Sequence, residues 1–252
     1  MQELRDSRVL VTGGSRGIGR AVCERFADAG ARVAVHYRAD ERAARDVLEH
    51  LPGDGHTILR ADLGAGEART LAAAALDALG RIDVLVNNAG VYEAHPVLDT
   101  DADEWAASWH RTIATNLIGP ADLIHAVAPH MVEQGGGRIV NITSRGAFRG
   151  EPDHAAYGAS KAGLNSLSQS MARALAPHGV YVTAVAPGFV ETDMATPYLH
   201  GPDGDAVRAQ SPMGRAASPD EIARVVVFLA TPGSESTTGA IVDVNGASYL
   251  RN

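Results

Sequence analysis

Three residues in the second half of the chain are suited to moving a proton. Tyr157 and Lys161 lie four residues apart in AYGASKAGL, which has the pattern of a helix, and Ser144 ends an apolar strand upstream. Residues at i and i+4 share one helix face, so the Lys161 ammonium is expected beside the Tyr157 phenol. Lowering a tyrosine pKa from about 10 to about 7 needs roughly 4 kcal/mol, and a nearby cation acts in that direction. The three residues therefore predict a general acid with a polarising partner.

A glycine-rich turn near the start of the chain predicts a dinucleotide site. The segment TGGSRGIG at 12–19 follows an apolar strand and precedes a helix. Because Gly13, Gly17 and Gly19 have no side chains, backbone N–H groups and the helix N-terminus can approach a pyrophosphate. The spacing G-x-x-x-G-x-G differs from the general G-x-G-x-x-G pattern, and a tight turn without a ligand is the alternative interpretation. A proton donor together with a dinucleotide indicates hydride chemistry at a carbonyl or an alcohol.

Seven short apolar segments, most of them separated by helical stretches, must position these residues. The segments are 8–12, 32–36, 56–61, 82–89, 138–144, 180–187 and 240–244, and the first helix is expected over 17–29. Continuous apolar strands with long crossovers predict a parallel sheet with helices on both faces, which binds its ligand at the carboxyl ends of the strands. We therefore predict an α/β fold with one doubly wound, seven-stranded sheet of the Rossmann type.

The length and the spacing of these segments predict a single domain over 1–252. The 252 residues lie within the range in which α/β proteins form one core, and no repeat or interdomain linker interrupts the pattern. Residues 189–217 are rich in proline and glycine and are predicted to be one long irregular stretch. Loops of that length in a compact domain are usually lids, so we expect a substrate lid here. The sequence Ser-Pro-Asp-Glu at 218–221 predicts a capping box at the start of a helix.

The composition argues against several classes of function. A net charge of −8 and the absence of a polybasic run argue against binding to nucleic acid or to an anionic membrane. The single cysteine, Cys23, excludes an internal disulfide and fits a small buried side chain. The histidines show no paired metal spacing, so no metal is expected. The apolar run after the charged N-terminus is too short for a signal sequence or a membrane span, and a cytoplasmic protein is expected.

Taken together, these motifs resemble those of the short-chain dehydrogenase/reductase family over essentially the whole chain. In chain order they are TGGSRGIG, Asp62-Leu63, NNAG at 87–90, Asn116 in ATNLIG, Ser144 in NITS, Tyr157-x-x-x-Lys161, and Pro187-Gly188 followed by Thr192. Within the family the chain is most similar to the 3-oxoacyl-[acyl-carrier-protein] reductases, through GRIVNITS, SPDEIARVVVFLA and DVNGASYL. Sugar, steroid and polyol dehydrogenases share these segments, so the substrate stays open.

The resemblance implies a role for each catalytic residue. Tyr157 would donate a proton to the carbonyl oxygen while the nicotinamide delivers hydride to the carbon, and oxidation would run the same path backwards. Lys161 would lower the tyrosine pKa and bind the nicotinamide ribose. Ser144 would hold the substrate oxygen, as a positioned donor to a developing alkoxide. Asn116 would position a water that feeds protons towards Lys161.

The resemblance also implies a set of cofactor-binding residues. Besides Tyr157 and Lys161 they are Gly13, Ser15, Arg16, Gly17, Ile18, Gly19, Tyr37, Arg38, Asp62, Leu63, Asn88, Ala89, Gly90, Pro187, Gly188, Val190 and Thr192. Asp62 would lie at the adenine, Asn88 to Gly90 along the adenosine ribose, and Thr192 at the carboxamide. An NAD enzyme of this fold usually ends its second strand with an acid, where this chain has His36-Tyr37-Arg38. Arg16 and Arg38 could bracket a 2′-phosphate, so NADP(H) is the predicted cofactor and NAD(H) the alternative.

These roles predict an NADPH-dependent oxidoreductase that reduces a carbonyl to a secondary alcohol, with a 3-oxoacyl thioester as one candidate substrate. An NAD(P)-dependent alcohol, sugar or steroid dehydrogenase working in the oxidising direction is the alternative, and a non-catalytic dinucleotide-binding regulator is a second. Polar residues near the site, among them Arg145, Glu151 and His95, suggest a polar or anionic substrate, although solvated loops would have the same composition. By analogy with the family a homotetramer is expected, with a dimer second.

Overall fold

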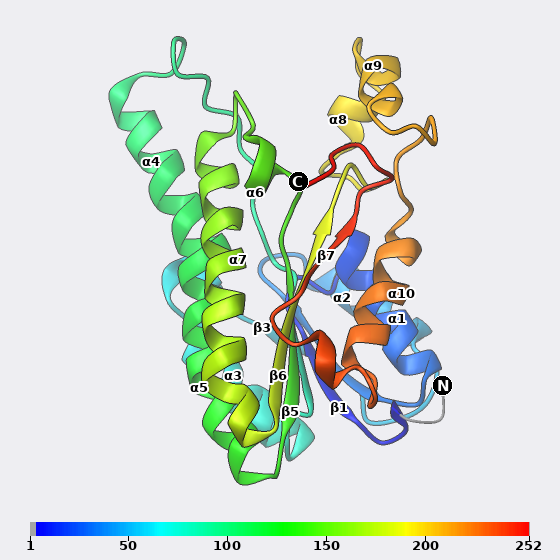
Figure 1. Cartoon of the computed structure of the whole chain (residues 1–252). Helices are drawn as coiled ribbons and strands as arrows, with labels where there is room; N and C mark the ends of the chain where they lie inside the picture. The colour runs from blue at the N-terminus through cyan, green and yellow to red at the C-terminus, as the bar shows by residue number, and fades with distance from the viewer. Residues whose placement is uncertain (1–3, 252) are drawn as a thin grey trace.

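The protein is built on one parallel sheet, seen in a computed structural model that describes residues 4–251 (Figure 1). The strand order is β3-β2-β1-β4-β5-β6-β7. The strands are β1 (Arg8–Val11), β2 (Arg32–Tyr37), β3 (Thr57–Arg60), β4 (Val84–Asn87), β5 (Gly137–Ile142), β6 (Val180–Pro187) and β7 (Ile241–Val244). Because β1 pairs with both β2 and β4, the strand order reverses at β1, and the predicted doubly wound, seven-stranded fold is confirmed.

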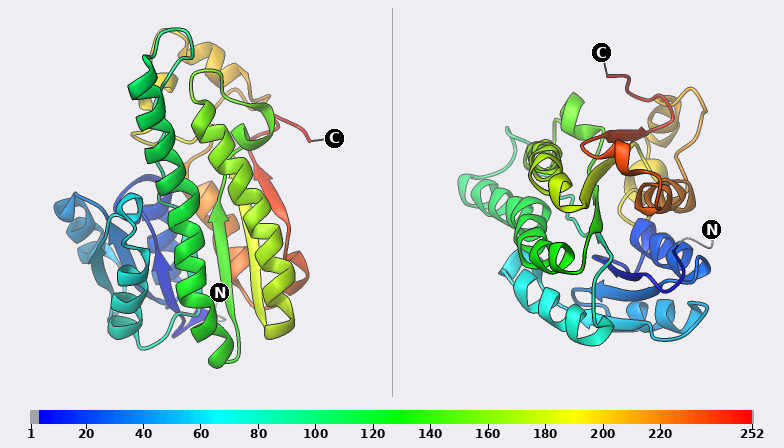
Figure 2. Two further views of the ribbon diagram at one scale, coloured as in Figure 1. Left: turned by 90° about the vertical axis from the view of Figure 1, so that its left-hand side faces the viewer. Right: turned by 60° about the horizontal axis from the view of Figure 1, so that its bottom comes forward.

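Helices cover both faces of this sheet (Figures 1 and 2). The helices on one face are α1 (Gly17–Asp28), α2 (Glu41–His50) and α10 (Pro219–Ala230). Those on the other face are α3 (Ala68–Leu79), α5 (Gly119–Glu133) and α7 (Ala155–Leu175), with α4 (Ala102–Ile113) against α7. Short helical pieces connect them: η2 (Leu63–Ala65), η3 (Ala114–Ile118), α6 (Gly146–Arg149), η4 (Ala176–His178) and η5 (Glu235–Thr237). Since helices cover both faces of the sheet, most residues of the central strands are buried and apolar.

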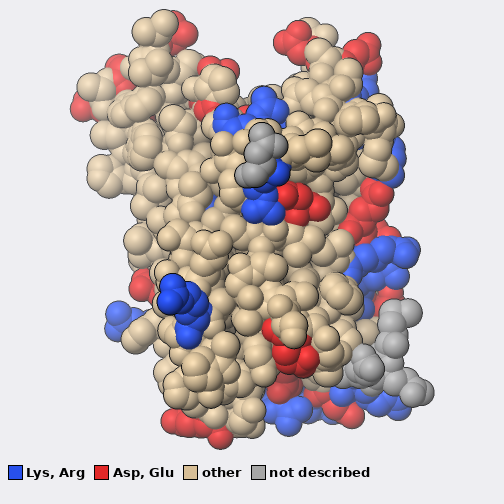
Figure 3. Space-filling view, viewed as in Figure 1, with Lys and Arg blue, Asp and Glu red and all other residues tan. Residues whose placement is uncertain are grey.

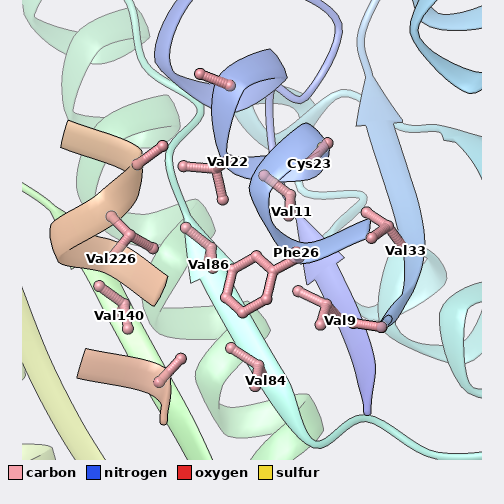
Figure 4. Packing of buried hydrophobic residues seen from close by; sticks show 14 of the residues in the cluster. Val9, Val11, Val22, Cys23, Phe26, Val33, Val84, Val86, Val140 and Val226 are labelled. Atoms are coloured by element: carbon pink, nitrogen blue, oxygen red, sulfur yellow. The ribbon is translucent and has the colours of Figure 1, made fainter. Parts of the chain in front are cut away.

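Each face of the sheet has its own hydrophobic core. On the side of α1 and α10, Phe26 is fully buried among the valines of β1 and β4, including Val9 and Val11 (Figure 4). Leu10 belongs to the core on the opposite face, since successive strand residues point to opposite sides. Burial of a side chain such as Phe26 contributes about 1.5–3 kcal/mol. Cys23 is buried in the first core, which confirms its predicted packing role.

Local signals in the sequence set the helix ends. At the start of α10, Ser218 Oγ accepts a hydrogen bond from the Glu221 N–H at 3.2 Å, and the Glu221 carboxylate accepts from the Ser218 N–H at 2.8 Å. This is the predicted capping box, and such a cap contributes about 1 kcal/mol. The Asp40 carboxylate caps α2 by accepting from the Ala43 N–H at 2.9 Å. The N-terminus of α1, in contrast, has no side-chain cap, so its first N–H groups stay open at the carboxyl edge of the sheet.

The segment 189–217 is more ordered than predicted. It contains two short helices, α8 (Thr196–Leu199) and α9 (Gly204–Ala209), and Val190 bridges to Ala217 at its base. The prolines suggest irregular structure, but a proline in the first turn also suits the start of a helix such as α8. Both helices lie beyond the carboxyl ends of β6 and β7 (Figure 1). The segment therefore stands over the edge of the sheet where the site is predicted.

The surface carries charges of both signs. On the face shown in Figure 3, arginine side chains form small groups interspersed with acidic ones. Within residues 4–251, no helix is long and apolar enough to cross a membrane. Over the same residues, no cluster of three or more His, Cys, Asp or Glu side chains could hold a metal ion.

Candidate active site

The carboxyl ends of the strands enclose a cavity of about 620 Å³. Most of the predicted site residues line it: Gly13, Ser15, Arg16, Gly17, Ile18, Tyr37, Arg38, Asn88, Ala89, Gly90, Ser144, Tyr157, Lys161, Pro187, Gly188, Val190 and Thr192. Cavities that bind cofactors and small molecules are of this size. The fold thus brings residues from six separate segments of the sequence to one place.

Tyr157 and Lys161 lie side by side at the start of α7. The Lys161 Nζ is 5.7 Å from the centroid of the Tyr157 ring and donates a hydrogen bond to the Ile142 carbonyl at 2.8 Å. Lys161 is only 4% exposed, and it is the only lysine in the chain. Because the carbonyl belongs to the end of β5, the sheet fixes the position of the ammonium relative to the phenol.

Burial dominates the ionisation of both side chains. It raises the pKa of Tyr157 to about 12, although a hydrogen bond with the Ser144 side chain acts in the opposite direction. It lowers the pKa of Lys161 to about 8, because a buried ammonium loses its hydration. Desolvation of the phenolate is thus the largest influence on the Tyr157 pKa, and the lowering of that pKa by Lys161 stays a prediction. Tyr157 is held as the protonated phenol, which is the form that a general acid needs.

Ser144 approaches Tyr157 from the end of β5. Its Oγ accepts a hydrogen bond from the Gly146 N–H at 3.0 Å, and its hydroxyl lies close enough to Tyr157 to lower the pKa of the phenol. A serine hydroxyl has one donor and two acceptor sites, so the bond from Gly146 fixes the side chain without using its hydrogen. Two hydroxyl groups from two elements therefore meet at one point of the cavity, where a single substrate oxygen can accept from both.

Asn116 lies just behind the cavity wall, in the π-helical turn Ala114–Ile118 between α4 and α5. Its Oδ1 accepts from the Val91 N–H at 2.8 Å, and its Nδ2 donates to the Val91 carbonyl at 3.0 Å. A Cβ added at Gly90 would lie 3.3 Å from Asn116 Oδ1 and 3.5 Å from Lys161 Nζ, so the two side chains are near neighbours. Such π turns are rare and occur frequently at functional sites. Asn116 thus clamps the loop after β4 beside Lys161, and its water-positioning role stays a prediction.

The turn between β1 and α1 is a cradle of backbone atoms. Gly13 and Gly17 have φ angles of 62° and 54°, which residues with side chains rarely adopt. The first turn of α1 carries neither a side-chain cap nor an acidic residue. Its N–H groups are therefore available to an anion, which the helix dipole also favours. The turn fits the pyrophosphate of a dinucleotide.

Side chains behind this turn hold it in place. Thr12 Oγ1 accepts from the Asn88 and Ala89 N–H groups at 2.9 and 3.0 Å. The Asn88 Nδ2 donates to the carbonyls of Thr12 and Gly13 at 2.9 and 3.1 Å. The His36 Nδ1 accepts from the Gly13 N–H at 3.0 Å, and burial lowers the pKa of this histidine, which keeps the ring neutral. Asn88, predicted along the ribose, uses its side chain on the turn itself.

Substitution of Gly19 by alanine is expected to disrupt the cradle. A Cβ at this position would lie 2.1 Å from the Gly13 carbonyl oxygen and 2.5 Å from Asn88 Nδ2, so α1 would have to move. Overpacking of this kind costs about 1–3 kcal/mol, and we expect Gly19→Ala to lower the free energy of unfolding by that amount and to weaken NADPH binding. Chemical denaturation and titration with NADPH measure the two effects. Gly80→Ala is the control: its φ of 78° also costs stability, but nothing lies within 4 Å, so an equal loss of NADPH affinity would contradict the assignment.

The glycine turn and the end of β2 each carry an unpaired arginine. Arg16 and Arg38 line the cavity with exposed side chains, and neither forms an ion pair with any other residue of 4–251. His36, one of the three residues at the strand end where an acid is usual, is 2% exposed and accepts a hydrogen bond from the glycine turn. Asp40 also lines the cavity, but its carboxylate caps α2 through the Ala43 N–H.

Four of the predicted site residues do not line the cavity: Gly19, Asp62, Leu63 and Asn116. Gly19 supports the turn from behind, and Asn116 clamps the loop after β4. The Asp62 carboxylate caps the η2 turn by accepting from the Gly64 N–H at 2.9 Å. Leu63 is 5% exposed and packs in the second core. The predicted contact of Asp62 and Leu63 with the cofactor gains no support from the cavity.

Aromatic side chains gather in the part of the cavity next to Tyr157. Tyr92 stacks on His154, with ring centroids 3.7 Å apart and planes inclined by 2°, and its ring meets that of Tyr157 edge-on at 4.7 Å. Tyr198 of α8 is hydrogen-bonded to His154 Nε2 at 2.9 Å. Tyr198 and Phe189 could not be predicted as site residues, because no local motif marks them. The only signal is an aromatic side chain in a segment otherwise rich in proline and glycine.

His95 secures the start of the helix that carries Tyr157. Its Nε2 accepts a hydrogen bond from the Ala156 N–H at 3.1 Å, and its Nδ1–H donates to the Glu93 carbonyl at 2.9 Å. The rings of Trp105 and Trp109 pack around it, with centroids 5.3 and 6.5 Å away. Since α7 has no cap from its own N-cap residue, a side chain from the loop after β4 serves as the cap.

Loss of this cap is expected to affect both stability and catalysis. His95→Phe leaves the buried Ala156 N–H without an acceptor, which costs about 1–3 kcal/mol of unfolding free energy, and it loosens the backbone next to Tyr157. Denaturation curves and kcat for carbonyl reduction measure the two effects. His95→Gln retains an acceptor and should recover part of both losses. Equal behaviour of the two variants would show that the hydrogen bond has no role beyond packing.

Comparison with known proteins agrees with this architecture. A family model described as enoyl-(acyl carrier protein) reductase matches residues 13–247. The 3-oxoacyl-[acyl-carrier-protein] reductase of Staphylococcus epidermidis is 37% identical over 244 residues, which cover 96% of this chain and 98% of that protein. The L-rhamnose 1-dehydrogenase (NAD(P)(+)) of Azotobacter vinelandii is 39% identical over 255 residues and 97% of each chain.

Solved structures give the same result. A short chain dehydrogenase from Burkholderia cenocepacia J2315 in complex with NADP has a TM-score of 0.88 at 33% identity, over 98% of this chain and 99% of that one. A short-chain dehydrogenase/reductase from Brucella melitensis has a TM-score of 0.89 at 34% identity over both full lengths. The matched motifs, the sheet order and these relatives agree, and the chain belongs to the short-chain dehydrogenase/reductase family, as an oxidoreductase acting on CH–OH or C=O groups.

Proposed function

We propose that this protein is an NADPH-dependent oxidoreductase that reduces a carbonyl to a secondary alcohol, with Tyr157 as the general acid. The observation that carries the proposal is the meeting of the Tyr157 and Ser144 hydroxyls, beside the Lys161 ammonium, in a cavity that opens onto the glycine turn. A carbonyl oxygen placed between the two hydroxyls accepts a hydrogen bond from each. Its carbon then faces the part of the cavity between Gly90 and Thr192, where the nicotinamide would lie.

The residues present fit NADP(H). The backbone of the glycine turn and the uncapped start of α1 would hold the pyrophosphate, while Arg16 and Arg38 would hold the 2′-phosphate. Gly90, Gly188 and Thr192 would border the nicotinamide end. When bound, the cofactor supplies the hydride. The NADP complex of the Burkholderia relative supports this choice, with NAD(H) as the alternative cofactor.

The chain's own residues would move the proton. Tyr157 holds its proton until the substrate oxygen gains negative charge, and Ser144 donates a hydrogen bond to the same oxygen. A positioned donor of this kind is worth about 10²- to 10³-fold in rate. Lys161 stabilises the phenolate that remains after the proton has left, and Asn116 holds the adjoining loop for a water that returns a proton. Ser144 and Lys161 are buried, at 8% and 4% exposed, which limits the access of water to them.

For the substrate, a 3-oxoacyl thioester is supported by the reductases among the relatives. A sugar or other alcohol, oxidised in the reverse direction, is the second candidate, and the rhamnose dehydrogenase relative and the polar groups around Tyr92 favour it. We further propose that residues 189–217 act as a substrate lid. The assembly we propose is a homotetramer, with a dimer as the alternative, formed through the helices that flank Asn116 and through α7.

A panel assay tests the function. NADPH oxidation is followed with 3-oxoacyl thioesters, cyclic ketones and keto-sugars, and NADP⁺ reduction is followed with the corresponding alcohols. The Tyr157→Phe protein provides the blank for each substrate. Turnover of at least one carbonyl by the wild type, and loss of that turnover in the blank, is the expected result. Nucleotide binding without turnover of any member of the panel would favour the non-catalytic regulator instead.

A further inference from the structure

Two arginines beside the cavity share one neutral acceptor. The Arg145 Nη2 donates to Gln210 Oε1 at 2.6 Å, and the Arg149 Nη1 donates to the same oxygen at 3.1 Å. Gln210 follows α9 in the segment over the site. Arg145 is 3% exposed, lies over the Phe189 ring at 5.0 Å, and lines the cavity. Among residues 4–251, neither arginine forms an ion pair.

This arrangement leaves positive charge unsatisfied. A buried guanidinium is normally paired with a carboxylate, because desolvation of an unpaired charge is unfavourable. Burial, followed by the nearby Arg149, lowers the pKa of Arg145, and the opposite effect of Glu151 does not offset this. Of the two acids near these arginines, Glu93 is paired with Arg111 at 3.0 Å. Glu151 is close enough for Arg149 and Arg145 to lower its pKa, but burial raises that pKa more, and Glu151 forms no ion pair with either arginine. Arg145 and Arg149, beside the reacting groups, therefore carry positive charge that no carboxylate among the described residues neutralises by an ion pair.

We propose that the substrate is an anionic carbonyl compound whose carboxylate or phosphate group binds Arg145 and Arg149. This inference rests on the proposed function. Arg145 directly follows Ser144, and its backbone N–H donates to the Pro187 carbonyl at 2.9 Å, so the anion site and the carbonyl site keep a fixed separation. An arginine side chain offers paired N–H donors that fit two oxygens of a carboxylate or a phosphate. The single, neutral amide oxygen of Gln210 accepts less strongly than such an anion would.

Matched substrate pairs test the proposal. The pairs are acetoacetate with methyl acetoacetate, and dihydroxyacetone phosphate with dihydroxyacetone, each assayed by NADPH oxidation. We expect the wild type to favour the anionic member of at least one pair by about tenfold or more in kcat/KM, because hydrogen bonds to charged groups have that effect. The pair that shows the preference identifies the anion as carboxylate or phosphate.

Two variants then test whether Arg145 and Arg149 cause the preference for the anionic substrate. Arg145→Gln removes the guanidinium, and Gln210→Glu places a carboxylate where the substrate anion would bind. Both should reduce the anionic-to-neutral ratio of kcat/KM by about tenfold or more. Gln210→Glu should not lower the melting temperature, because it pairs with two arginines, so a folding defect cannot account for its effect. Arg173→Gln, an exposed arginine towards the other end of α7, is the control and should keep the wild-type ratio.

The outcomes separate this proposal from the proposed function. A wild type that reduces neutral ketones but shows no anionic preference overturns the anion site and leaves carbonyl reduction intact. An anionic preference that survives in both Arg145→Gln and Gln210→Glu also overturns the anion site, since other residues would then bind the negative charge of the substrate. Failure to reduce any carbonyl of either pair or of the wider panel overturns the proposed function itself.

Discussion

Replacement of Tyr157 by phenylalanine is expected to lower kcat/KM for carbonyl reduction by about 10²- to 10⁴-fold, the range for loss of a general acid. The ring and its contact with Tyr92 remain, so only the hydroxyl that would protonate the substrate oxygen is removed. NADPH affinity should stay close to that of the wild type. Tyr181→Phe, at the opposite end of the sheet in β6, is the matched control and should retain activity. Activity that survives in Tyr157→Phe would remove the assigned acid.

The pH dependence of the wild type should follow Lys161. Burial lowers the pKa of this ammonium to about 8, so it is charged below that pH and neutral above it. The charged form stabilises the phenolate left when Tyr157 gives up its proton, so reduction should slow as the pH rises through about 8. Tyr157, with a pKa of about 12, stays protonated over this range. A rate of reduction that continues to rise above pH 8 would contradict this role of Lys161.

Removal of both guanidinium groups, that of Arg16 in the glycine turn and that of Arg38 after β2, should abolish the proposed preference for NADPH. Each of Arg16 and Arg38 would make charge-assisted hydrogen bonds to a 2′-phosphate, worth about 1.5–3 kcal/mol, or roughly ten- to a hundredfold in affinity. We expect each single substitution to alanine to raise KM for NADPH by such a factor, and the double variant to raise it further. KM for NADH should change much less, because NADH has no phosphate at that position.

An exposed arginine nearby provides the control for this experiment. Arg42 lies in α2 and does not line the cavity, so Arg42→Ala removes the same charge without the proposed contact. It should leave the ratio of the two KM values unchanged. Tighter use of NADH than of NADPH by the wild type would overturn the cofactor assignment before any variant is made.

The parts of the fold that follow from local patterns could be predicted from the sequence. Continuous apolar runs gave the seven strands, and the capping box over 218–221 marked the start of α10 correctly. The spacing of Tyr157 and Lys161 on one helix placed both in the cavity. The predicted strand 82–89 ends earlier in the structure, at Asn87, because the next residues leave the sheet to hold the glycine turn.

What could not be predicted depends on contacts between distant segments. The spacing of Tyr157 and Lys161 suggests a lowered tyrosine pKa, whereas the depth of burial, which raises it, is set by the assembled helices and sheet. Asp62 has the right motif for a cofactor contact, but its carboxylate caps the next turn. The support of α7 by His95 joins residues 61 positions apart, and no local pattern indicates it.

The uniqueness of Lys161 has a practical consequence for chemical labelling. Reagents that acylate or reductively alkylate amines find only one ε-amino group in the 252 residues, and it lies in the cavity, 4% exposed. Because its pKa is about 8, roughly a tenth of this amine is in the nucleophilic, unprotonated form at pH 7, far more than for an ordinary lysine. If modification of the α-amino group is set aside, the fraction of modified protein then reports how accessible the Lys161 amine is to the reagent. A ligand that protects the amine from acetylation would be detected by mass spectrometry as one missing increment of 42 Da, about the mass of one acetyl group replacing a hydrogen.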